Sequence, residues 1–203
     1  SRADRTICCM QHENLWAPWR MAYLRELERS AAAAGESAAA EATAADFLAA
    51  YWNDPSADDE HLIVHRGTHG LILLNRYPYA GGHLLVALGD ARPTLLDHDP
   101  EQRAELWRLV ELATDLMQRA LNPQGINIGI NQGRAAGAGL PEHLHVHLVP
   151  RWNADTNFIT TVADVRVIPE SLERMLETYR RHLPDVLADA AAEPGGVGQH
   201  VRQ

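Results

Sequence analysis

Three histidines stand at every second position of one short segment, "PEHLHVHLVPRW". They are His143, His145 and His147. Side chains alternate between the two faces of a β-strand, and each residue advances the strand by about 3.3 Å. As a strand, the segment would place the three imidazoles on one face, with neighbours about 6.6 Å apart. Its leucines and valine would point to the opposite face, so the segment predicts an imidazole row opposite an apolar face.

Three explanations of this imidazole row compete. Alternate histidines on a strand can bind zinc and leave one coordination position open, although no cysteine lies near the segment. A neutral imidazole can instead attack phosphorus through one ring nitrogen while the other nitrogen holds the proton. Flanking histidines can then orient that ring, bind phosphate and protonate the leaving oxygen, which favours His145 as the attacking residue. The third explanation is a strand that carries histidines without a function.

A glycine-rich loop, "QGRAAGAGLPE", directly precedes the row. It contains Gly133, Gly137 and Gly139. Glycines allow backbone N–H groups to approach a phosphate closely. The loop and the row together predict a site for phosphoryl or nucleotidyl transfer.

Composition limits the classes of protein that fit. The 203 residues are 46% hydrophobic, which is enough for one domain with its own core. A formal net charge of -9 argues against a protein that grips nucleic-acid backbone, but it is compatible with a single bound nucleotide. The sequence shows no membrane-spanning run and no signal-peptide pattern. The two cysteines, Cys8 and Cys9, are adjacent, which excludes a disulfide framework and predicts a cytoplasmic protein.

Hydrophobic periodicity indicates the elements that position the row. Short apolar runs at 61–67, 70–75 and 83–88, separated by turn residues, predict consecutive antiparallel strands. A long helix follows, with Asp99 as N-cap, Pro100 at the first helical position and Gln102 completing a capping box. Its apolar stripe contains Leu106, Leu109, Val110, Ala113, Met117 and Ala120. The helix is expected to end at Asn122, Pro123 and Gly125.

Two further strands are predicted at 126–131 and 143–150, and a last helix near 169–187, with Pro184 limiting it. The order of strands, helix, strands and helix predicts an α+β fold. We expect an antiparallel sheet of about five strands, one long helix and a C-terminal helix.

Four regions are expected along the chain. Residues 1–12 are interpreted as an N-terminal extension without fixed structure. Residues 13–59 form an N-terminal helical segment with an Ala-rich insertion, and residues 60–190 form the main domain. Residues 191–203 are expected to be a flexible C-terminal tail.

Three segments resemble the histidine triad (HIT) family. "HLHVHLVPRW" resembles its H-x-H-x-H signature, and "LILLNRYPYAGGHLLVAL" resembles the two strands that line its nucleoside pocket. "NQGRAAGAGLPEHLHVHLVPRWNADTNF" resembles the phosphate loop and strand of the branch that includes bacterial diadenosine tetraphosphate phosphorylases, and "LWAPWRMAYL" fits that branch too. The resemblance therefore implies a HIT-like fold for the main domain.

The resemblance implies a covalent nucleotidyl intermediate, usually adenylyl, on the middle histidine. Release to inorganic phosphate makes a phosphorylase, which converts diadenosine tetraphosphate to ADP and ATP. Release to water makes a hydrolase of dinucleoside polyphosphates or nucleoside phosphoramidates. A low-turnover nucleotide-binding sensor and a zinc-binding module stay open as alternatives. The resemblance further implies a homodimer. Trp107 on the long helix fits either an interface or the core, of which the core is expected.

The resemblance assigns catalytic roles to five residues. His145 matches the nucleophile, and His143 and His147 match its supporting members. His83, in "GGHLLV", matches a fourth histidine that faces the triad. Asn131 matches the polar residue that begins the phosphate loop.

The resemblance also assigns substrate binding to Asn75, Leu73, Leu85, Ala138, Gly139 and Trp152. Asn75 matches a ribose contact, and Leu73 and Leu85 match apolar walls near the base, although strand leucines are usually core. Trp152 matches an aromatic residue that helps hold the dinucleotide, or it packs at the rim.

This sequence departs from the family pattern in two places. Many relatives carry a Cys-x-x-Cys pair that binds structural zinc, whereas Asp46 and Ala49 stand at those positions here. Structural zinc is therefore not expected, since His61 and His65 alone do not close a tetrahedral site. Gly139 stands where several relatives have a hydroxyl residue, which removes a contact to phosphate or leaving group. No cofactor is expected for the covalent step, although Mg²⁺ can accompany the nucleotide.

Overall fold

The computed structural model describes residues 46–153, 155 and 170–192. The predictions for residues 1–12, for the Ala-rich insertion up to residue 45 and for the tail from residue 193 lie outside these ranges. The bounds of the four predicted regions accordingly stay predictions.

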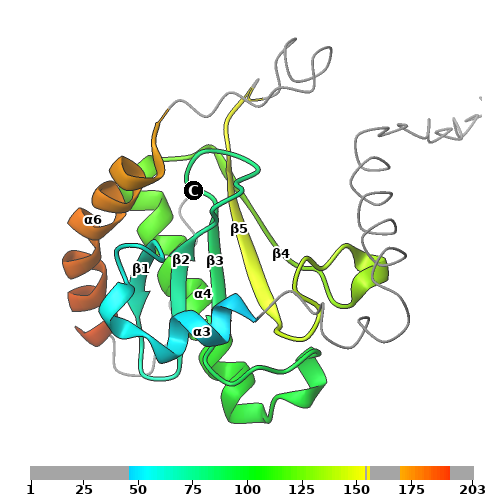
Figure 1. Ribbon diagram of the computed structural model, residues 1–203. Coiled ribbons are helices and arrows are strands. Elements are labelled where there is room, and N and C mark those ends of the chain that lie inside the picture. Colours follow the sequence, from blue (N-terminus) through cyan, green and yellow to red (C-terminus); the bar gives the residue numbers. More distant parts are fainter. Residues whose placement is uncertain (1–45, 154, 156–169, 193–203) are drawn as a thin grey trace, which may run out of the picture. The chain divides into compact units, whose positions relative to one another are not determined.

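Five antiparallel strands form one sheet, in the order β1-β2-β3-β5-β4 (Figure 1). They are β1 (Ile63–Arg66), β2 (Gly70–Leu74), β3 (Leu84–Leu88), β4 (Gly125–Ile130) and β5 (His145–Arg151). Strand β5 lies between β3 and β4 and therefore occupies an inner position of the sheet. The predicted α+β fold with a five-stranded antiparallel sheet is confirmed.

Within the described residues, three α-helices accompany the sheet: α3 (Phe47–Asn53), α4 (Pro100–Leu121) and α6 (Leu172–Ala192). Short 3-10 turns occupy Pro55–Ala57, Leu95–Asp97 and Arg134–Ala136. The predicted capping box of α4 is present, because the Asp99 carboxylate accepts from the Gln102 N–H at 2.8 Å and the Gln102 side chain accepts from the Asp99 N–H at 3.0 Å. Asn122 ends the helix in the left-handed conformation. No helix in the described ranges is long and apolar enough to span a membrane.

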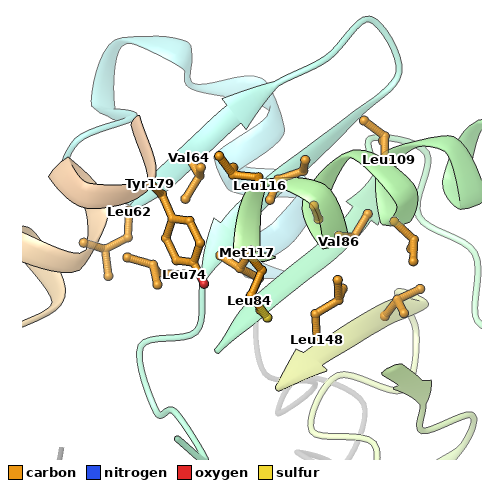
Figure 2. Close-up of a cluster of buried hydrophobic side chains, with 14 of the residues drawn as sticks. Leu62, Val64, Leu74, Leu84, Val86, Leu109, Leu116, Met117, Leu148 and Tyr179 are labelled. Atoms are coloured by element: carbon orange, nitrogen blue, oxygen red, sulfur yellow. The ribbon is translucent and has the colours of Figure 1, made fainter. Parts of the chain in front are cut away.

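Strands β2 and β3 are buried on both faces of the sheet. Helix α3 lies on one face of the sheet and α4 lies behind it (Figure 1). The larger core lies between the sheet and helices α4 and α6 (Figure 2). The side chains labelled there are Leu62, Val64, Leu74, Leu84, Val86, Leu109, Leu116, Met117, Leu148 and Tyr179. A smaller core on the α3 side joins Leu48 to Leu71, Leu73, Leu85 and Ala87. Burial on both faces explains why β2 and β3 read as continuous apolar runs.

The prediction that Pro184 limits the last helix is wrong, because α6 continues to Ala192. Proline lacks the N–H that an interior helical position would donate. Apolar contacts outweigh this loss, since Val186 beyond the proline is buried in the larger core. On the preceding turns Tyr179 is fully buried, and its hydroxyl donates to the carbonyl of Gly82 at 2.6 Å.

The prediction that Trp107 lies in the core is also wrong, because 44% of its surface is exposed. The buried stripe of α4 includes Leu106, Leu109 and Val110. Trp107 follows Leu106 by one residue, which rotates it by about 100° around the helix. That rotation places its ring outside the stripe.

Candidate active site

The triad histidines do not all lie on a strand. Strand β5 begins at His145, so His143 lies in the bend that precedes it. The backbone turns there because the N–H of Leu144 donates to the carbonyl of Arg92 instead of joining the sheet ladder. The expectation of three histidines along one strand is therefore corrected to two, with His143 held separately.

His145 and His147 share the face of the sheet that α3 covers. His145 pairs with Ala87, and His147 pairs with Leu85. Directly paired residues of antiparallel strands point to the same face. Since Leu85 also pairs with Leu73, a continuous row runs from Leu73 through Leu85 to His147.

A cavity opens at the apolar end of this row. It is lined by three of the predicted binding residues, Leu73, Leu85 and Asn75. Its wall also contains residues that sequence reasoning did not assign to a binding site: Phe47, Tyr51, His61 and Tyr77. Leu85 both lines the cavity and pairs with His147 across the strands, so one side chain separates the cavity from His147 along this row. The assigned contacts to ribose and base stay predictions.

The residues that stand where many relatives carry zinc-binding cysteines do not fit a zinc site. Asp46 contacts His143, but Ala49 has no ligand atom, and the ring of His61 stacks on Tyr51 with 3.8 Å between centroids. In the described part of the chain no group of three or more His, Cys, Asp or Glu side chains is placed to hold a metal ion.

Two donors fix the proton of His83, a fully buried residue directly before β3. The backbone N–H of Tyr79 donates to its Nδ1 at 3.1 Å, and the side-chain nitrogen of Asn75 lies 3.2 Å from the same atom. A backbone N–H only donates, so Nδ1 accepts and the ring proton sits on Nε2. This Nε2–H donates to Nδ1 of His147 at 3.0 Å. The neutral ring of His147 therefore carries its own proton on Nε2.

The surroundings keep His147 neutral. Burial, with a smaller contribution from the neighbouring His145, lowers the pKa of His147 to about 4. The ring of Tyr79 stacks near His147 with 5.8 Å between centroids. His147 can therefore offer an N–H donor to an incoming oxygen without carrying a charge.

His145 has the protonation that a nucleophile needs. Its Nδ1 lies 2.9 Å from the backbone carbonyl of His143, which only accepts, so Nδ1 carries the proton and Nε2 the lone pair. Burial is the main cause that lowers the pKa of His145, and the charge of His143 contributes. The ring edge of His145 meets His147 with 4.9 Å between centroids. A neutral imidazole with its lone pair on Nε2 thus lies beside a neutral N–H donor, as nucleophilic attack would require.

His143 uses both ring nitrogens within the protein. Its Nδ1 lies 2.9 Å from both carboxylate oxygens of Asp46, and its Nε2 lies 2.7 Å from the carbonyl of Leu88. The side chain is buried, and with both nitrogens engaged neither is available to a substrate in this arrangement. Sequence reasoning placed Asp46 at a lost zinc position and did not identify this contact, which joins residues 97 positions apart.

The glycine-rich loop is closed largely by its own hydrogen bonds. The N–H groups of Ala136 and Ala138 donate to the carbonyl of Gly133, and the N–H of Gly137 donates to Arg134. Gly133 and Gly137 both have positive φ angles, at 81° and 86°, which favours glycine there. These three N–H groups are therefore already engaged, contrary to the expectation of a loop lined with unengaged donors.

Three further predicted residues lie at the ends of β4 and β5 and in the loop between these strands. Asn131 follows β4 and is half-buried at the start of the loop. Gly139 is exposed, and a Cβ added to it would meet nothing within 4 Å. Trp152 follows β5, is half-buried, and its N–H donates to Asp155. The roles of these residues stay predictions.

Fold and site define a class of protein, a HIT-like domain with histidines beside a pocket. The sequence pattern of the HIT domain matches residues 57–154. An AP-4-A phosphorylase of Mycobacterium tuberculosis is 37% identical over 171 residues, which cover 83% of this chain and 84% of that protein. The chain belongs to the HIT family, and the predicted family and branch are confirmed.

Solved structures agree with this assignment. A Zn-bound histidine triad family protein from Mycobacterium smegmatis matches with a TM-score of 0.58 and 26% identity, over 73% of this chain and 99% of that chain. A hypothetical histidine triad nucleotide-binding protein from Sulfolobus tokodaii matches with a TM-score of 0.60 and 25% identity, over 74% of this chain and 99% of that chain. The chain is accordingly an enzyme of the HIT family.

Proposed function

We propose that this chain is a phosphorylase that cleaves diadenosine tetraphosphate with inorganic phosphate to give ADP and ATP. The observation that carries the proposal is the row from Leu73 through Leu85 to His147, because it leads from an apolar cavity wall to the neutral donor that lies beside His145. The substrate is inferred from the AP-4-A phosphorylase that shares 37% identity with the chain.

In the first step, Nε2 of His145 attacks the phosphorus nearest one adenosine. A P–N bond forms, the P–O bond to the rest of the molecule breaks, and ATP leaves. His147 donates its Nε2–H as a hydrogen bond to the oxygen on which negative charge develops. The adenosine of the adenylyl group occupies the cavity of Leu73, Leu85 and Asn75, which fixes the phosphorus in front of His145.

In the second step, an oxygen of inorganic phosphate attacks the adenylyl phosphorus. The P–N bond to His145 breaks, ADP leaves, and the lone pair returns to Nε2. We assign the loop contact to the transferred phosphate to the backbone at Gly139, since the N–H groups of Ala136, Gly137 and Ala138 already donate within the loop. Mg²⁺ would accompany the nucleotide polyphosphate as a counterion and is no part of the covalent step.

Hydrolysis is the second candidate. A bis(5'-nucleosyl)-tetraphosphatase (asymmetrical) of Schizosaccharomyces pombe is 32% identical over 93 residues, which cover 46% of this chain and 50% of that protein. Water would then replace phosphate in the second step and give AMP instead of ADP. Gly139 favours this candidate, since it lacks a hydroxyl that would help to select the acceptor.

We further propose that the chain acts as a cytoplasmic homodimer. The edge strand β4 supports this, because 43% of the surface of its Ile128 is exposed and the strand has one unpaired side. Light scattering after size exclusion tests it, and a monomer at micromolar concentration would contradict it.

The function is tested with purified full chain and diadenosine tetraphosphate, with and without radiolabelled inorganic phosphate. The proposal expects turnover that needs phosphate, equal amounts of ADP and ATP, and the label in ADP. AMP and ATP formed at the same rate without phosphate would establish hydrolysis instead. Measurable nucleotide binding without product under either condition would favour a sensor.

A further inference from the structure

We propose that Asp46 is a positioning residue for the nucleophile, acting on His145 through His143. The inference deepens the proposed function, on which its kinetic part rests. Asp46 lies directly before α3, far from the triad in sequence, and both of its carboxylate oxygens lie 2.9 Å from Nδ1 of His143.

The hydrogen-bond partners of the two ring nitrogens of His143 define what this contact does. The carbonyl of Leu88 only accepts, so the Nε2 of His143 donates to it, 2.7 Å away. A second hydrogen bond joins Nδ1 of the same ring to the carboxylate of Asp46. Asp46 and Leu88 thereby hold the ring from opposite sides and leave it a single orientation.

The fixed ring in turn fixes a backbone group. The carbonyl of His143 accepts the Nδ1–H of His145 at 2.9 Å. That hydrogen bond holds the proton of His145 on Nδ1 and keeps the lone pair on Nε2, the nitrogen that attacks. If the ring of His143 turns, its carbonyl moves, and His145 can take the unproductive tautomer.

Asp46 is itself oriented by the helix that forms the pocket wall. Its Oδ1 accepts from the N–H of Ala49 at 3.0 Å as the N-cap of α3. The same short helix contributes Phe47 and Tyr51 to the wall of the nucleoside cavity. One element thus sets the pocket wall and, through Asp46, the nucleophile.

Substitution of Asp46 must separate positioning from helix capping. Serine is about as good an N-cap as aspartate, so Asp46→Ser keeps the cap of α3 and removes the contact to His143. Asp46→Asn keeps the cap and replaces the carboxylate by a neutral amide. Asp99→Ser is the matched control, since it makes the same change at the N-cap of α4, away from the triad.

The first readout needs no substrate. The full chain labelled with ¹⁵N-histidine reports the tautomer of each ring by NMR. We expect His145 to be protonated on Nδ1 alone in the wild type and in Asp99→Ser, and to show both tautomers in Asp46→Ser. An unchanged His145 in a folded Asp46→Ser protein would overturn the inference.

The second readout is kinetic. For Asp46→Ser we expect kcat for diadenosine tetraphosphate to fall about 10- to 100-fold, with KM changed by less than about twofold, as for other residues that orient a reacting histidine. Asp46→Asn should fall between this variant and the wild type. A fall in Asp99→Ser of the same size, or none in Asp46→Ser, would contradict positioning. An inactive wild type would refute the proposed function alone, because the NMR result stands without turnover.

Discussion

Nε2 of His83 lies 3.0 Å from Nδ1 of His147, although 64 positions separate the two residues. The backbone N–H of Tyr79 gives this hydrogen bond its direction, because it forces Nδ1 of His83 to accept. A main-chain N–H at a turn therefore determines which ring nitrogen of His147 carries the proton that is donated in the proposed reaction.

Removal of His83 should slow chemistry more than binding. In His83→Ala the His147 ring loses the donor to its Nδ1 and can take either tautomer, so we expect kcat to fall about 10- to 100-fold with KM nearly unchanged. Steady-state kinetics on diadenosine tetraphosphate measure this. His65→Ala, a half-buried histidine on β1, is the control and should retain the wild-type kcat. Equal loss in both variants would point to a general defect in folding.

His147→Ala should make the reaction depend more steeply on the leaving group. In the proposed reaction His147 stabilises charge on the departing oxygen, so a poor leaving group needs it most, and the rate should fall about 100- to 1,000-fold. A series of aryl esters of AMP with graded leaving-group acidity measures the rate of adenylyl transfer. We expect the ester with the most acidic leaving group to recover much of the lost rate. Uniform slowing across the series would assign His147 to binding alone.

Acid should inactivate the enzyme only below the ordinary pKa of histidine. The pKa of His145 lies below 6.5 and that of His147 falls to about 4, chiefly through burial. Because the proposed nucleophile is the neutral form of His145, kcat/KM should stay level at pH 6.5 and decline between that value and about pH 4. A decline already complete at pH 6.5 would contradict the neutral pair. Diadenosine tetraphosphate has no terminal phosphate to titrate in this range.

The same two histidines should make the fold less stable in acid. The unfolded chain binds protons at histidine near pH 6.5, whereas the folded state resists protonation until lower pH. Their contribution is complete above pH 6.5 and is lost as the pH falls through the range down to about 4. Thermal denaturation from pH 4 to pH 7 tests this, and His147→Gln should flatten the dependence. A slope that is unchanged in that variant would contradict the burial of a neutral His147.

Gly139→Ser should restore a missing hydroxyl without disturbing the fold. The added Cβ meets nothing within 4 Å and the position is exposed, so the free energy of unfolding should change by less than about 0.5 kcal/mol. We expect a higher rate with phosphate relative to water as acceptor. Gly125→Ser is the control, because its Cβ would meet only Arg151, at 4.0 Å. The same acceptor ratio in all three proteins would exclude Gly139 from the choice of acceptor.

Local signals in the sequence predicted most of the fold. The capping box of Asp99 and Gln102 and the apolar periods lie within a few residues, so they are readable without tertiary contacts. Pro184 misled the prediction because its local cost is offset by packing of Val186, which depends on the rest of the chain. Local rules do not contain that compensation.

The site was predictable where a motif marks it and not where the fold assembles it. The alternation in "HLHVHLVP" identified the histidines, but the bend at His143 depends on a hydrogen bond from Leu144 to Arg92. Asp46 meets His143 across 97 positions, and Tyr79 acts through a backbone N–H that no side-chain pattern records. Such contacts form only when the folded chain brings distant residues together, so no local sequence pattern predicts them.

Trapping the covalent intermediate tests most directly whether His145 is the nucleophile. The full chain is mixed with diadenosine tetraphosphate without phosphate, denatured in alkali to protect the P–N bond, and analysed by peptide mass spectrometry. We predict one adenylyl group on His145, no adduct in His145→Ala, and release of the adduct as ADP when phosphate is added before denaturation. An adduct on another residue, or His145→Ala with most of the wild-type turnover, would contradict it.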